Sequence, residues 1–297
     1  MQAVNKVDIS PMIIGTMRLG EWGAKLQTNE LQAFIEGCIE LDLTTFDHAD
    51  IYGNYTTEED FGKVLNWKPE LRRQMQIITK CGINIVADNR PNHRIKSYDS
   101  SAKHIIKSVE NSLKALHTDY VDVLLLHRPD MLMEPDEIAE AVRKLFISGK
   151  IHAFGVSNFN TNQVELLKKN IHLFTNQIEA SLLHLDPFED GTLEQCQLHR
   201  MKPMAWSPLG SGLLFLESKN ENVKRIQEVA KPMLKKYGVT FDQLLLAFLR
   251  RHPSGIIPVL GTTNLEHVRS AKGALKMEMD REDWYDLWQA SKGETIA

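Results

Sequence analysis

The chain has 297 residues, a formal net charge of −4 at pH 7, 42% hydrophobic residues and 25% charged residues. This composition is that of an ordinary globular protein with a sizeable apolar core. The mild acidity argues against nucleic acid or an anionic membrane as the main partner. The three cysteines, Cys38, Cys81 and Cys196, form no CxxC pair and no disulfide framework, which favours a reducing compartment.

Membrane and export signals are weak throughout the sequence. Residues 1–8 contain no apolar core of signal-peptide length. The longest apolar runs, such as Val123–Leu126, are far too short to span a bilayer. We therefore expect a soluble, cytoplasmic monomer whose partner is a small molecule, with neither nucleic acid nor a membrane as partner.

Short apolar runs alternate with longer amphipathic stretches along the whole chain. The lengths of these runs suit buried strands, because a strand covered on both faces reads as a continuous apolar run. The eight runs are Met12–Ile14, Thr44–Phe46, Gln76–Thr79, Val121–Leu126, Ala153–Val156, Thr175–Ile178, Pro203–Ala205 and Ile256–Val259.

The stretches between the runs predict helices. Thr28–Leu41 carries apolar residues at helical spacing, and Thr28 is a candidate N-cap. Ser100 or Ser101 is the candidate N-cap of the next clear helix. Each of these stretches is therefore expected to place one apolar face against the strands.

Helix boundaries are also marked further along the chain. Pro135 opens a stretch that Gly149 closes, which is the usual asymmetry of helix ends. Asp242–Leu249 is almost wholly apolar and is predicted to be buried. Roughly eight strand–helix units in series predict a (β/α)8 TIM barrel, formed by residues 1–297 as a single domain.

An open doubly wound sheet is the competing topology. It requires a glycine-rich turn, GxGxxG, after the first strand, and residues 15–20 do not supply one. Gly210 and Gly212 lack a third glycine at the required place. Two loops, residues 81–99 and 207–222, are longer than connectors need to be and predict binding loops at the carboxyl ends of barrel strands.

Polar, chemically capable residues lie at the end of most apolar runs. In a barrel these ends meet at one face, which is where barrel enzymes place their sites. We therefore expect side chains that are scattered in sequence to converge in space. They are Asp47, Lys80, His127, Ser157, Asn158, Gln177, Trp206 and Ser207.

The chemistry of this set points to proton transfer. A lysine beside an aspartate stays protonated, and its ammonium lowers the pKa of a neighbouring tyrosine from about 10. Tyr52, just beyond Asp47, would then donate a proton to an oxygen near neutral pH, and His127 could hydrogen-bond the same oxygen. Carbonyl reduction also needs a hydride, which only a cofactor can deliver.

The chain resembles the aldo-keto reductase superfamily, in particular its bacterial NADPH-dependent oxidoreductases. The matching segments occur in the family's order and cover most of the chain. They are FDHADIYG at 46–53, ITKCG at 78–82, LLLHRPD at 124–130, GVSNF at 155–159, NQIE at 176–179, WSPLGSG at 206–212 and IPVLGTTNLEHV at 257–268.

The resemblance implies a (β/α)8 barrel that reduces an aldehyde or ketone with NADPH. Asp47, Tyr52, Lys80 and His127 match the family's catalytic tetrad. In that scheme Tyr52 protonates the carbonyl oxygen, Lys80 paired with Asp47 lowers the pKa of Tyr52, and His127 orients the carbonyl. Tyr55 is a rival proton donor that lies off the motif position.

The resemblance also implies a set of cofactor contacts. Ser157, Asn158 and Gln177 match the residues that hold the nicotinamide carboxamide, and Trp206 matches the ring stacked on the nicotinamide. The loop from Ser207 to Ser211 matches the pyrophosphate contact. The full implied set is Gly15, Thr16, Met17, Asp47, Ser157, Asn158, Gln177, Trp206, Ser207, Pro208, Leu209, Gly210, Ser211, Gly261, Thr262, Thr263, His267 and Arg269.

One departure from the family concerns the adenosine phosphate. Relatives that use NADPH often carry Lys or Arg after the eighth strand, where this chain has Gly261, Thr263 and His267, with Arg269 two residues further on. A neutral histidine is a weak phosphate partner and an arginine a strong one. NADPH is the expected cofactor, and NADH remains open.

Two other functions remain as alternatives. The first is a nicotinamide-cofactor-sensing binding module with little turnover. The second is a Schiff-base lyase that uses Lys80, although Asp47 would keep that lysine charged. A metal-dependent hydrolase is disfavoured because the histidines show no HxxxH or HxH pair at metal spacing near a carboxylate. The C-terminal Trp284 and Trp288 either close the pocket or pack on the barrel.

Overall fold

The computed structural model describes residues 7–296. The prediction that residues 1–8 form no signal peptide therefore falls mostly outside the described residues. Its strands are β1 (Ile13–Gly15), β2 (Thr45–Asp47), β3 (Gln76–Cys81), β4 (Ile83–Asn84), β5 (Ser97–Tyr98), β6 (Val121–Leu126), β7 (Ile151–Ser157), β8 (Asn176–Glu179), β9 (Met204–Trp206) and β10 (Ile257–Leu260).

The α-helices are α1 (Thr28–Glu40), α2 (Tyr52–Tyr55), α3 (Thr57–Trp67), α4 (Ala102–Ala115), α5 (Pro135–Ile147), α6 (Thr161–Lys168), α7 (Thr192–His199), α8 (Glu221–Tyr237), α9 (Phe241–Arg250), α10 (Leu265–Lys272) and α11 (Arg281–Lys292). Four 3₁₀ turns complete the set: η1 (Pro69–Gln74), η2 (Asp186–Phe188), η3 (Gly210–Phe215) and η4 (Gly273–Lys276).

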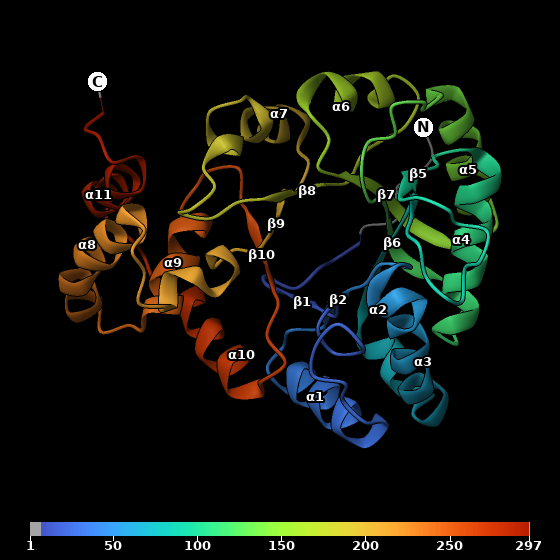
Figure 1. Ribbon diagram of the computed structural model, residues 1–297, viewed down its shortest axis with the longest axis horizontal. Coiled ribbons are helices and arrows are strands. Elements are labelled where there is room, and N and C mark those ends of the chain that lie inside the picture. The colour runs from blue at the N-terminus through green and yellow to red at the C-terminus, as the bar shows by residue number, and fades with distance from the viewer. Residues whose placement is uncertain (1–6, 297) are drawn as a thin grey trace. The chain divides into compact units, whose positions relative to one another are not determined.

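Eight parallel strands form a closed barrel in the order β1-β10-β9-β8-β7-β6-β3-β2 (Figure 1). Each of them overlaps one of the eight apolar runs, so the predicted (β/α)8 TIM barrel is confirmed. Strands β4 and β5 stand apart as a two-stranded antiparallel ribbon. The loop that contains this ribbon, residues 83–98, is called the ribbon loop below.

The chain packs into two units. Among the described residues, the first comprises 7–177 with Gly261–Thr263, and the second comprises Ile178–Leu260 with 264–296. The expectation of one domain over residues 1–297 therefore stays a prediction. No helix within residues 7–296 has both the length and the apolar character needed to cross a bilayer.

In the first unit, the core lies around the fully buried side chains of the strands. Phe46, Ile77 and Phe154 are each at most 1% exposed. Helices α3, α4 and α5 run along the outside of β3, β6 and β7 (Figure 1). Helix α3 comes so close to α4 that a Cβ on Gly62 would lie 1.9 Å from the carbonyl oxygen of Ala115. Only a residue without a side chain fits there.

The helix boundaries largely follow the predicted signals. Ser101 is the N-cap of α4, and its hydroxyl accepts a hydrogen bond from the backbone N–H of His104. Pro135 opens α5, and Gly149 follows it with a φ of 71°. The prediction for α1 was wrong by one residue. Gln27 is its N-cap, because Gln27 and Glu30 bond each other's backbone N–H groups in a capping box.

In the second unit, α9 forms the centre of the core. Its residues Leu244–Leu249 are buried, as the apolar run predicted. Trp284 of α11 stacks on Phe248 with ring centroids 4.8 Å apart, and its indole N–H donates to the Phe248 carbonyl at 3.0 Å. Trp288 stacks in turn on Trp284 at 5.3 Å. The two C-terminal tryptophans therefore pack within this core.

We predict that Gly62→Ala destabilises the protein even though alanine favours a helix by about 1 kcal/mol. Overpacking against the backbone of α4 costs about 1–3 kcal/mol, so the clash outweighs the helix preference. Denaturant unfolding followed by circular dichroism measures the difference. Lys63→Ala is the matched control, because its exposed pair with Asp60 contributes little. Equal or greater stability of Gly62→Ala would contradict the packing described here.

Candidate active site

Lys80 lies at the centre of a buried group of polar side chains. It is 1% exposed and lies near the end of β3. Its Nζ donates to Asp47 Oδ2 at 2.7 Å and to the backbone oxygen of His48 at 2.8 Å. A third bond reaches Tyr52 Oη at 3.1 Å. An ammonium has three protons, so this arrangement uses all of them.

Tyr52 is held by the loop that follows β2. The register of the parallel strands pairs Asp47 with Ile78, and the backbone N–H of Asp50 donates to the Lys80 carbonyl at 3.0 Å. The ring of Tyr52 is 9% exposed and lies between two other rings. Trp22 is 6.1 Å away and His127 is 5.9 Å away between centroids. Other rings thus pack against the ring of Tyr52, and its hydroxyl accepts a hydrogen bond from Lys80.

Two opposing effects act on the pKa of Tyr52. Burial raises it above its ordinary value, and the Lys80 ammonium lowers it without overcoming burial. Lys80 thus acts on the pKa of Tyr52 in the expected direction, and burial, which the sequence does not reveal, is the larger effect. Burial alone would lower the pKa of Lys80, but the Asp47 carboxylate and Tyr52 raise it. Both groups therefore stay protonated at neutral pH.

His127 follows β6 and faces the same group. Its backbone N–H donates to the Cys81 carbonyl at 2.9 Å, which ties the end of β6 to the end of β3. Burial and the nearby charges of Lys80 and Arg128 hold the pKa of its imidazole well below the usual value. Its Nδ1 is buried and has no hydrogen-bond partner among the described residues. The side chain is therefore a neutral imidazole.

A chain of hydrogen bonds extends from Asp47 to the ends of β7 and β8. Asp47 Oδ1 accepts from the side-chain amide of Gln177 at 3.0 Å. The Ser157 hydroxyl donates to the Gln177 backbone oxygen at 2.9 Å and accepts from Asn158 Nδ2 at 2.8 Å. Asn158 Nδ2 also lies 3.3 Å from the His127 backbone oxygen. The tetrad residues and three of the expected carboxamide contacts thus form one network.

The three residues implied at the end of β1 differ in their surroundings. Gly15 pairs with Asp47 in the strand register. Thr16 is fully buried, and its hydroxyl lies 3.0 Å from both the Asp47 backbone oxygen and His48 Nδ1. Met17 is 40% exposed. Thr16 therefore braces the strand end, and Met17 is the member of this group with an accessible side chain.

In the second unit, the expected pyrophosphate loop forms a tight turn after β9. Trp206 is the last residue of that strand and is half-buried. Ser207, Gly210 and Ser211 have positive φ values of 50°, 59° and 54°. The Ser211 hydroxyl donates to the Ser207 hydroxyl at 3.1 Å. Pro208 and Leu209 complete the turn. Backbone N–H groups in such left-handed turns form concavities that bind anions.

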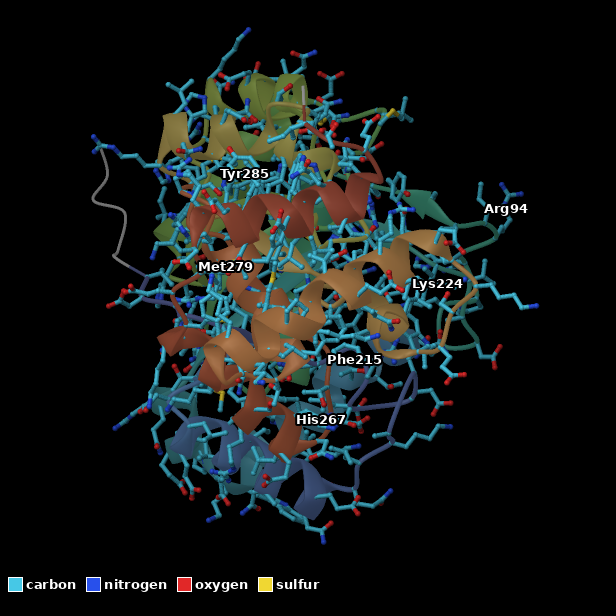
Figure 2. The ribbon with its side chains drawn as sticks, turned by 90° about the vertical axis from the view of Figure 1, so that its left-hand side faces the viewer. Arg94, Phe215, Lys224, His267, Met279 and Tyr285 are labelled. Atoms are coloured by element: carbon cyan, nitrogen blue, oxygen red, sulfur yellow. The ribbon has the colours of Figure 1, made fainter. Side chains whose placement is uncertain are left out.

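The segment after β10 is open. A Cβ on Gly261 would meet no atom within 4 Å, and Thr262 and Thr263 are half-buried. Helix α10 begins after Asn264, which caps it, and its exposed side chains include His267 and Arg269 (Figure 2 labels His267). Arg269 Nε lies 3.5 Å from Glu266 Oε1. Arg269, the candidate partner for the adenosine phosphate, is therefore already part of a weak exposed ion pair.

The donor groups fit a nicotinamide dinucleotide when each unit is considered by itself. In the first unit, Ser157 and Asn158 place hydroxyl and amide groups beside the tetrad. In the second, the left-handed turn at 207–212 and the capped start of α10 offer backbone N–H groups suited to phosphate. Both kinds of group match the chemistry of such a cofactor.

Two acids beside the tetrad, the partly buried Asp50 and the buried Glu58, have no signal in the sequence. Burial raises the pKa of Asp50 and of Glu58. Glu58 Oε1 accepts from the Thr79 hydroxyl at 2.5 Å. Acidic residues are mostly exposed, so their type alone does not mark them as buried. The backbone oxygen of His48 was missed for a different reason, since any residue could supply it.

Two other features bear on alternative chemistry. Burial raises the pKa of the Cys81 thiol well above its ordinary value, which makes it a poor nucleophile. Within residues 7–296, no group of three or more His, Cys, Asp or Glu side chains is placed to hold a metal ion.

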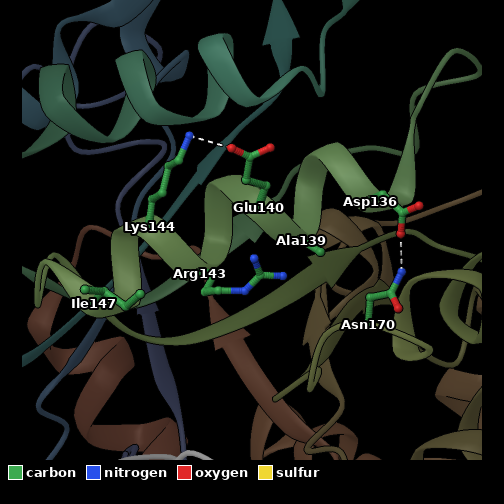
Figure 3. A pocket seen from close by; sticks show the side chains of 7 residues that line it. All are labelled: Asp136, Ala139, Glu140, Arg143, Lys144, Ile147 and Asn170. Carbon is green, nitrogen blue, oxygen red and sulfur yellow. Dashed lines mark hydrogen bonds and ion pairs between the residues drawn. The ribbon is translucent and has the colours of Figure 1, made fainter.

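A surface pocket on α5 lies outside this group (Figure 3). Four of its polar side chains form two pairs: Lys144 with Glu140 at 2.6 Å, and Asn170 with Asp136. Exposed pairs of this kind are ordinary surface features, so the pocket is not a candidate active site.

Comparison with known proteins agrees with this geometry. Residues 11–292 match the model of the aldo/keto reductase family. The oxidoreductase YcsN of Bacillus subtilis is 42% identical over 100% of this chain and 99% of its own length. The 6-dehydroglucose reductase of Agrobacterium fabrum is 43% identical over 99% of this chain and 98% of its own.

A solved structure extends the comparison. The aldo/keto reductase of Klebsiella pneumoniae, solved with NADP and acetate, is 29% identical with a TM-score of 0.76, covering 94% of this chain and 90% of its own. The family match spans nearly all of both units. This chain belongs to the aldo/keto reductase family.

Proposed function

We propose that this oxidoreductase transfers a hydride from NADPH to the carbonyl carbon of an aldehyde or ketone while Tyr52 protonates the carbonyl oxygen. The observation that carries the proposal is the bond between Lys80 Nζ and Tyr52 Oη at 3.1 Å, within an ammonium whose other two protons are bound. This hydrogen bond places the protonated Tyr52 next to a fixed positive charge.

The residues of this chain then have separate roles in the reduction. Tyr52 gives its phenolic proton to the oxygen that becomes negative as the carbonyl is reduced. Lys80 stabilises the resulting phenolate, and Asp47 keeps Lys80 in place. Neutral His127 can donate a hydrogen bond to the same oxygen. Proton donation of this kind contributes about a hundred- to ten-thousand-fold to the rate.

A Schiff-base role for Lys80 is disfavoured by the same geometry. That chemistry needs a neutral amine, usually obtained by lowering the pKa of a desolvated lysine. Here the Asp47 carboxylate and Tyr52 raise the pKa of Lys80 against the effect of burial. The nitrogen lone pair is therefore not available for attack.

NADPH is the proposed cofactor because the Klebsiella pneumoniae neighbour binds NADP and the donor groups of this chain fit it. The proposed contacts are the residues that the family resemblance implied, with Arg269 as the candidate for the 2′-phosphate. The 43% identity to the Agrobacterium fabrum 6-dehydroglucose reductase makes aldehyde sugars a sensible part of a substrate panel. The cytoplasmic location and the monomeric state remain predictions.

Tyr52→Phe should keep cofactor affinity and lose most carbonyl reduction, by about a hundred- to ten-thousand-fold, because only the proton donor is removed. The measurement is NADPH oxidation with a panel of aldehydes, diketones, quinones and aldehyde sugars. Tyr98→Phe is the matched control, since its exposed ring lies on β5. Undiminished turnover in Tyr52→Phe would refute the assignment. Tight cofactor binding without turnover in the wild type would favour the sensing module.

Arg269→Ala should weaken NADPH binding about tenfold and leave NADH binding unchanged, because a charge-assisted bond to the 2′-phosphate exists only with NADPH. Fluorescence titration with both cofactors measures the two affinities. Lys272→Ala, which removes a positive charge from the end of the same helix, is the control. If the variant lost the same affinity for both cofactors, Arg269 would not recognise the 2′-phosphate.

A further inference from the structure

Three consecutive residues after Tyr52 adopt the left-handed conformation. Gly53, Asn54 and Tyr55 have φ values of 59°, 56° and 68°. Glycine and asparagine tolerate this region, but a tyrosine rarely occupies it. Strained residues persist where surrounding contacts hold them, and they concentrate at functional sites. Contacts made by Tyr55 must therefore stabilise its left-handed conformation.

Tyr55 is directed at the ribbon loop. Its Oη accepts a hydrogen bond from the backbone N–H of Ile85 at 3.0 Å. His93 Nδ1 lies 3.0 Å from the Ile85 backbone oxygen and 3.4 Å from Tyr55 Oη. The two side chains thus bind both backbone polar groups of one loop residue. The guanidinium of Arg90 lies 4.2 Å above the Tyr55 ring.

A further bond joins the same two segments. Asn89 Nδ2 donates to the Asn54 backbone oxygen at 2.9 Å. The loop residues Ile85, Asn89, Arg90 and His93 therefore all contact the left-handed turn, whereas Arg94 lies at the outer edge of the loop (Figure 2).

The ribbon loop is also packed against the tetrad. Ile83, its first residue, belongs to one buried apolar cluster with Tyr52, and Tyr55 and Ile85 pack against that cluster. The antiparallel register pairs Ile83 with Tyr98 and Asn84 with Ser97, which joins the two ends of the loop. The loop therefore borders Tyr52.

We propose that Tyr55 is a positioning residue that fixes the ribbon loop beside Tyr52 and thereby sets the affinity for the carbonyl substrate, without taking part in proton transfer. The proposal rests on the proposed reductase function. The contacts of Tyr55 argue against the rival role of proton donor, because the three protons of the Lys80 ammonium go to Asp47, His48 and Tyr52, whereas the Tyr55 hydroxyl lies on the ribbon loop. Losing the hydroxyl would free the loop while leaving the Lys80–Tyr52 contact intact.

The test compares Tyr55→Phe with the wild type in two independent measurements. In steady-state reduction we expect KM for the carbonyl to rise about three- to tenfold, the factor typical of one lost hydrogen bond, with kcat and the NADPH dissociation constant within about twofold. In hydrogen exchange we expect faster exchange of amides 85–97 and unchanged exchange in β2 and β3. A loss of kcat with unchanged KM would overturn the proposal, as would unchanged loop exchange.

Variants at His93 supply the rescue. His93→Leu cannot bind the Ile85 carbonyl and should reproduce the rise in KM, whereas His93→Asn can place an amide N–H near the position of Nδ1 and should restore most of the affinity. Tyr98→Phe removes a hydroxyl from the same ribbon and should change neither measurement. Equal effects of Leu and Asn at position 93 would contradict the proposed hydrogen bond. If the wild type reduced no carbonyl, the proposed function would fail, and faster loop exchange in Tyr55→Phe would still show that the contact holds the loop.

Discussion

The buried ammonium of Lys80 is the constraint on which the catalytic end of the first unit depends. A charge that is 1% exposed is stable only if its protons are bound and its charge is balanced. The Asp47 carboxylate balances the charge and accepts one hydrogen bond. The His48 carbonyl and the Tyr52 hydroxyl accept the other two hydrogen bonds of the ammonium. Those three acceptors come from one six-residue stretch, so the position of the lysine dictates the path of the chain after β2.

That path has a further consequence for the residues beyond Tyr52. The chain turns sharply through three left-handed residues, and this turn directs Tyr55 away from Lys80 and towards the ribbon loop. Two tyrosines three residues apart thereby serve different neighbours. Tyr52 faces the buried charge, and Tyr55 faces a backbone amide. The division follows from backbone geometry, because neither side chain could reach the partner of the other without undoing the turn.

The sequence predicted the barrel well because buried parallel strands leave continuous apolar runs, and all eight runs became strands. It also predicted that the four tetrad residues lie close together, because Asp47, Lys80 and His127 follow apolar runs and Tyr52 lies just beyond Asp47. It did not reveal how strongly burial opposes the Lys80 ammonium in setting the pKa of Tyr52, since desolvation depends on how tightly neighbouring rings such as Trp22 and His127 enclose the phenol. The His48 carbonyl, the buried Glu58 and the contacts of Tyr55 left no pattern, because they depend on backbone atoms and on tertiary packing.

The most direct test of this account is the ionisation of Tyr52 itself, followed by NMR of tyrosine labelled at Cζ in the wild type and in Lys80→Met. Tyr52→Phe identifies the resonance. Because the ammonium lowers the phenol pKa against the effect of burial, the account predicts that the pKa of Tyr52 rises further when Lys80 is replaced. An unchanged or lower pKa in Lys80→Met would contradict the central role of the Lys80–Tyr52 contact.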